Sequence, residues 1–112
     1  MHSVKEQALE KPDFPRILEE LNLTWEEERR RRREFYAIMK EDEKVEFING
    51  EIVYQSPARY AHIVTRGNLE ALLRAFVLPR RLGVVLSEKS LVSLSRNDYE
   101  PDVCFFSAGK AA

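Results

Sequence analysis

The dipeptide Asn49-Gly50 constrains the fold of this chain more than any other feature. It separates two runs rich in β-branched and aromatic residues, in the stretch KVEFINGEIVYQ. A two-residue type I′ turn needs positive φ at both central positions, which Asn-Gly tolerates best. The sequence therefore predicts a hairpin that pairs residues 45–48 with residues 51–54. Strand alternation places Val45 and Phe47 on one face and Glu46 on the other.

A helix is predicted before the hairpin. Thr24 and Glu27 have the spacing of a capping box, so the helix is expected to begin at Thr24 and to end near residue 40. Residues 1–23 are polar, contain two prolines and are expected to form an N-terminal arm. The charged run EEERRRRRE within the helix has acidic residues four positions before basic ones, which favours a solvated, self-paired face. Phosphate contact by its arginines is the alternative.

A second helix is predicted over residues 56–78, and three strands follow it. Ser56 is the expected N-cap and Pro57 the first helical residue. Gly67 lowers helix propensity, which suggests close approach of another backbone. Strands are expected within residues 82–90, 91–95 and 102–106. This order indicates an α+β fold, with an N-terminal helix and a β-hairpin, then a helix packed on a mainly antiparallel sheet. We expect one domain, residues 24–112.

Composition excludes several classes of protein. The 112 residues carry 18 Lys and Arg against 19 Asp and Glu, a net charge of -1, so no global basic field marks a strong non-specific nucleic-acid binder. The single cysteine, Cys104, excludes an internal disulfide and a multi-cysteine zinc site. The N-terminus lacks an apolar signal core, and no apolar run is long enough to span a membrane. We expect a cytoplasmic protein that does not contact membranes.

Three residues are candidates for chemistry, and each has an ordinary alternative. Asp102 opens the last predicted strand, where a carboxylate suits a hard metal ion, but it could equally cap the preceding turn. His62, near the start of the second helix, is either a hydrogen-bonding residue or a catalyst. Glu46 on its own is a typical solvent-facing strand residue.

Taken in order, these motifs resemble the Uma-type restriction-endonuclease-like family of the PD-(D/E)xK nuclease superfamily, over residues 24–112. The matching positions are Glu46-Phe47-Ile48, Gly50-Glu51, Ser56-Pro57, His62 and Pro101-Asp102-Val103. The resemblance implies a partial restriction-endonuclease-like fold and metal-dependent hydrolysis of DNA phosphodiesters. It also implies Glu46, His62 and Asp102 as active-site positions, with Asp102 and Glu46 as ligands of Mg²⁺ or Mn²⁺.

The sequence departs from the family pattern after Asp102. No E-x-K motif follows, and Lys110 stands alone. The site is therefore expected to be incomplete or inactive in this chain, as in a C-terminally truncated member. The alternative is a non-catalytic nucleic-acid-binding or oligomerisation module on the same scaffold. An unpaired edge on the strand that follows Asp102 invites association, so a homodimer is expected.

Overall fold

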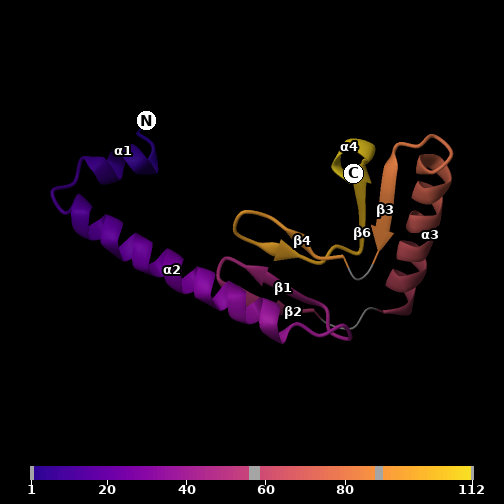
Figure 1. Cartoon of the computed structure of the whole chain (residues 1–112), viewed down its shortest axis with the longest axis horizontal. Helices are drawn as coiled ribbons and strands as arrows, with labels where there is room; N and C mark the ends of the chain where they lie inside the picture. Colours follow the sequence, from indigo (N-terminus) through magenta and orange to yellow (C-terminus); the bar gives the residue numbers. More distant parts are fainter. Residues whose placement is uncertain (1, 56–58, 88–89, 112) are drawn as a thin grey trace. The chain divides into compact units, whose positions relative to one another are not determined.

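The structure is a computed structural model, and it describes residues 2–55, 59–87 and 90–111 (Figure 1). The chain divides into two compact units, residues 1–38 and residues 39–112. The first unit is helical, and the second contains the strands and the remaining helices. In the described ranges, no helix is long and apolar enough to cross a membrane.

The first unit consists of α1 (Val4–Leu9) and α2 (Phe14–Ile38). The predicted helix start at Thr24 is wrong, because α2 passes through this residue without interruption. The Thr24 hydroxyl donates a hydrogen bond of 2.9 Å to the carbonyl of Glu20, one turn back. The hydroxyl therefore has its hydrogen-bond partner inside the helix. The charged face is self-paired as expected at Arg30, whose guanidinium contacts Glu27 and Glu34.

The predicted hairpin is confirmed. Strand β1 (Val45–Ile48) pairs antiparallel with β2 (Glu51–Tyr54), with Val45 opposite Tyr54 and Ile48 opposite Glu51. Asn49 and Gly50 have φ values of 50° and 85°, the positive values that this turn requires. Val45 and Phe47 are buried on one face of β1, so the alternation inferred from the sequence holds.

Two short strands complete the hairpin's sheet. Strand β4 (Val92–Ser93) pairs with β5 (Asp98–Tyr99), and β5 pairs with β1 through Phe47 and Asp98. Within the described residues, the strand order of this sheet is β2-β1-β5-β4, and every pairing is antiparallel. The sequence patterns missed β5 because two residues are too short to show an alternation.

The remaining strands form a separate antiparallel pair. Strand β3 (Gly83–Ser87) pairs with β6 (Val103–Ser107), from Gly83 opposite Ser107 to Ser87 opposite Val103. Each strand of this sheet has one edge that pairs with no other described strand. The short helix α4 (Ala108–Ala111) follows β6. The α+β class is confirmed, although the single expected sheet is divided in two.

Helix α3 (Tyr60–Val77) contacts β3 and confirms the second predicted helix. Its expected cap, Ser56-Pro57, lies outside the described residues. The expected close approach at Gly67 is wrong, because a Cβ there would meet nothing within 4 Å. Most large apolar side chains of α3 are exposed. Val77 is buried, whereas Leu72 is 70% exposed.

Candidate functional site

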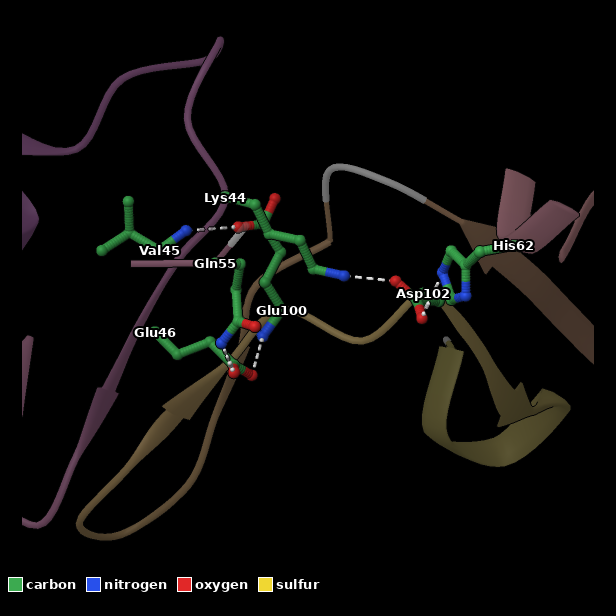
Figure 2. Close-up of polar contacts among 7 residues, drawn as sticks. All are labelled: Lys44, Val45, Glu46, Gln55, His62, Glu100 and Asp102. Carbon is green, nitrogen blue, oxygen red and sulfur yellow. Dashed lines mark hydrogen bonds and ion pairs between the residues drawn. The ribbon is translucent and has the colours of Figure 1, made fainter. Parts of the chain in front are cut away.

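Asp102 lies at the centre of a charged cluster in the second unit (Figure 2). One carboxylate oxygen, Oδ1, accepts a hydrogen bond from the Lys44 ammonium. The other, Oδ2, lies 3.0 Å from Nε2 of His62. We call Lys44, His62 and Asp102 the Asp102 cluster. The structure therefore brings two of the three predicted site residues, His62 and Asp102, into direct contact.

Three separate segments deliver these side chains. Lys44 immediately precedes β1, His62 lies in the first turn of α3, and Asp102 immediately precedes β6. The backbone N–H of Gln55 donates a hydrogen bond of 2.9 Å to the carbonyl of Lys44. This bond continues the β1–β2 ladder by one residue. All three residues thus sit at element ends, where side chains reach solvent while their backbones are fixed.

Two cationic side chains, Lys44 and Arg66, act on the Asp102 carboxylate. The Lys44 ammonium holds the pKa of the Asp102 carboxyl below its usual range, His62 and Arg66 lower it further, and partial burial opposes them. Arg66 follows His62 by one helical turn, so both project from the same side of α3. The His62 side chain is 48% exposed. The arrangement suits an anion such as a phosphate, which would meet several donors at once.

Glu46 lies on a neighbouring set of hydrogen bonds. Its Oε1 accepts a hydrogen bond of 2.7 Å from the Gln55 side-chain amide, and its Oε2 accepts one of 2.9 Å from the backbone N–H of Glu100. The structure therefore places Glu46 against the segment that leads to Asp102, while its two oxygens are engaged by nitrogen donors. Its predicted role as a metal ligand stays a prediction.

The described donors do not by themselves fit a resident metal ion. Both oxygens of Asp102 face the cationic or hydrogen-bond donor groups of Lys44 and His62, which compete with a metal for the same lone pairs. In the described residues no group of three His, Cys, Asp or Glu side chains could hold an ion. An ion bound here would need further ligands, such as waters and substrate oxygens.

Lys44 is the functional candidate that the sequence patterns missed. It lies in the charged run EDEK before the hairpin, which is typical of an exposed linker, and 58 residues separate it from Asp102. No local spacing connects the two residues. The only available clue was its position two residues before Glu46, on the same side of an extended strand.

Comparison with known proteins identifies the family. Residues 25–112 match the family Uma2, described as "Putative restriction endonuclease". The chain belongs to the Uma2 family. No curated protein matches it.

A solved structure agrees with the Uma2 assignment at the level of the fold. It is the crystal structure of "a putative nuclease belonging to DUF820" from Anabaena variabilis, with a TM-score of 0.62 and 17% sequence identity. The similarity covers 67% of the present chain and 41% of the Anabaena chain. This Uma2 chain therefore spans less than half of the neighbour's length. At this identity the likeness shows the nuclease-like fold alone.

Proposed function

We propose that this chain carries the phosphate-binding part of a DNA endonuclease site, with phosphodiester hydrolysis as the reaction of the completed site. The observation that carries the proposal is the Asp102 cluster, in which a carboxylate joins an imidazole 3.0 Å away and a lysine from a distant segment. Membership of the Uma2 family supports the choice of a nucleic acid as the substrate.

Each member of the cluster has a definite task in this proposal. Because a carboxylate only accepts hydrogen bonds, its contact with Nε2 of His62 places the imidazole proton on that nitrogen. Nδ1 then takes a proton from the attacking water as the P–O bond to that water forms. The opposite P–O bond breaks, and the leaving oxygen takes a proton from solvent. Lys44 and Arg66 would stabilise the negative charge of the phosphate.

The site is proposed to be incomplete in this chain. The resemblance to the restriction-endonuclease-like family implies Mg²⁺ or Mn²⁺, and the described residues supply no three-ligand group for it. We therefore expect the chain to bind DNA at the Asp102 cluster and to cleave it slowly or not at all.

A binding experiment tests the proposal. In fluorescence anisotropy with a labelled DNA duplex, Lys44→Met should weaken binding several-fold and reduce the salt dependence by about one phosphate contact. Lys110→Met, which removes an exposed lysine outside the cluster, is the matched control and should have a smaller effect. Equal losses in the two variants would mean that binding is diffuse, and no loss in either would contradict the phosphate site.

A cleavage experiment tests the claim of incompleteness. Supercoiled plasmid is incubated with the chain in Mg²⁺, in Mn²⁺ and in EDTA, with Asp102→Ala in parallel. We expect little or no metal-dependent nicking. Robust nicking that Asp102→Ala abolishes would support the nuclease function and show that the chain, alone or as an oligomer, completes its own site.

The alternative function is a non-catalytic nucleic-acid-binding module. The exposed arginines of α2 favour it, because they form a basic run beyond the ion pairs of Arg30. DNA binding that needs no metal, depends strongly on salt and is unaffected by Lys44→Met would select this alternative.

We also propose a homodimer formed through the β3–β6 sheet. A two-stranded sheet is marginally stable alone, and in the described structure the outer edge of β6 is open to another strand. Phe105 on β6 is among the exposed apolar side chains. Light scattering should give twice the chain mass, and a monomer at all concentrations would contradict the dimer.

A further inference from the structure

Two glutamate side chains, Glu46 and Glu100, connect β1 with the segment that leads to Asp102 by accepting hydrogen bonds from backbone N–H groups. The Glu100 carboxylate accepts a hydrogen bond of 3.1 Å from the backbone N–H of Val45. The Glu46 carboxylate accepts one of 2.9 Å from the backbone N–H of Glu100 (Figure 2). Glu100 is 6% exposed, so this exchange takes place largely away from water. We call this pair of glutamates the carboxylate clamp.

The clamp continues a strand pairing by means of side chains. Strands β1 and β5 are in antiparallel register at Phe47 and Asp98. Moving two residues outward along each strand places Val45 opposite Glu100. In an ordinary ladder such a pair could exchange N–H groups with backbone carbonyls. Here both N–H groups go to carboxylates instead, which extends the attachment of the chain to β1 beyond the end of β5.

The hydrogen bonds of the clamp lie next to Lys44 and Asp102 in the sequence, so the clamp can set the positions of both residues. Lys44 directly precedes Val45, and Asp102 is separated from Glu100 by Pro101. Proline fixes its own φ and restricts the residue before it, so fewer free backbone torsions lie between Glu100 and Asp102 than in an ordinary segment. Both partners of the Lys44–Asp102 contact therefore lie within two residues of a clamp hydrogen bond.

We propose that Glu46 and Glu100 are positioning residues that set the contact between Lys44 and Asp102, an inference that rests on the proposed function of the Asp102 cluster. Glu46 acts through the backbone of Glu100 and not as a ligand or a catalytic residue. Its role depends on accepting hydrogen bonds, and its negative charge is not required.

This distinction makes Glu46→Gln the decisive variant. The substituted amide keeps an oxygen that can accept from the Glu100 N–H, and the Gln55 amide can turn to present its own oxygen to the new NH₂ group. A positioning residue therefore tolerates Glu46→Gln and fails as Glu46→Ala. A residue that works through its charge, as a metal ligand does, fails in both variants.

The experiment is NMR spectroscopy of the full chain, with Glu51→Ala as the control, since Glu51 is an exposed glutamate on the same hairpin. Hydrogen exchange at the Glu100 amide measures the clamp. The imidazole ¹⁵N shifts of His62 report whether Nε2 still carries the proton that faces Asp102. Glu46→Ala should speed exchange at Glu100 about three- to tenfold, as expected for the loss of one hydrogen bond, and should change the His62 shifts.

Glu46→Gln and Glu51→Ala should leave both measurements as in the unmodified chain. Unchanged His62 shifts in Glu46→Ala would overturn the proposal, because a role confined to hairpin stability does not reach that imidazole. Loss of the His62 signature in Glu46→Gln would overturn it too, and this variant decides the matter where Glu46→Ala does not fold. Neither measurement uses DNA, so a failure here is separate from a failure of the proposed nuclease function.

Discussion

The Lys44–Asp102 contact should be measurable as a coupling energy in a double-mutant cycle. The two side chains are 27% and 36% exposed, so the pair is neither buried nor fully solvated. Fully exposed ion pairs contribute about 0.2–1 kcal/mol, and hydrogen bonds to charged groups about 1.5–3 kcal/mol. A contact at intermediate exposure should lie between these ranges, and we expect a coupling of about 1–1.5 kcal/mol at neutral pH.

The cycle needs the unmodified chain, Lys44→Met, Asp102→Asn and the double variant, each unfolded in urea. The coupling is the destabilisation by the double variant subtracted from the sum of the two single effects. The same cycle on Glu27 and Arg30, which are 51% and 50% exposed, is the control and should give a smaller coupling. A coupling for Lys44 and Asp102 no larger than that of the Glu27–Arg30 control would refute the reasoning, because the contact would then be no stronger than a solvated pair.

Four further outcomes are expected. Gly50→Val should lower the free energy of unfolding by at least about 1 kcal/mol, because φ there is 85°; an unchanged urea midpoint would contradict the turn. Gly83→Ala should lower it by about 2 kcal/mol or more, since its Cβ would lie 2.0 Å from the carbonyl oxygen of Phe106 at a φ of 157°. Gly67→Ala, with nothing within 4 Å, should raise it by about 0.5–1 kcal/mol. Because the folded-state pKa of Asp102 is lowered, its stabilising contribution should be complete above about pH 3.9 and lost as pH falls through the lower folded value; Asp102→Asn should remove this component from an acid titration.

Sequence patterns predicted the features that depend on neighbouring residues. Asn49-Gly50 led to the correct hairpin and register, because turn geometry follows from the φ preferences of two adjacent residues. The start of α2 was wrong for a complementary reason. Thr24 and Glu27 satisfy the spacing of a cap, but nothing in that spacing excludes helix on the N-terminal side, and the preceding residues are helical down to Phe14.

The candidate site was only partly accessible from the sequence. His62 and Asp102 were chosen through a family resemblance, and their contact became visible only once α3 and β6 were placed. Glu46 was chosen on the same basis, but its bonds to Gln55 and Glu100 motivate a different role. No local pattern marks Glu100 as a buried residue, yet its side chain is only 6% exposed.

The sequence by itself determined the hairpin, the existence of two long helices, the α+β class and the Uma2 resemblance. Each depends on propensities or periodicities within a few residues, so they are encoded locally. Only the tertiary structure decided that the strands form two sheets, that Lys44 reaches Asp102, and that two carboxylates continue the pairing of β1 where β5 ends. These contacts join residues 54 to 58 positions apart, and their partners are selected by the packing of whole elements, which no local pattern records.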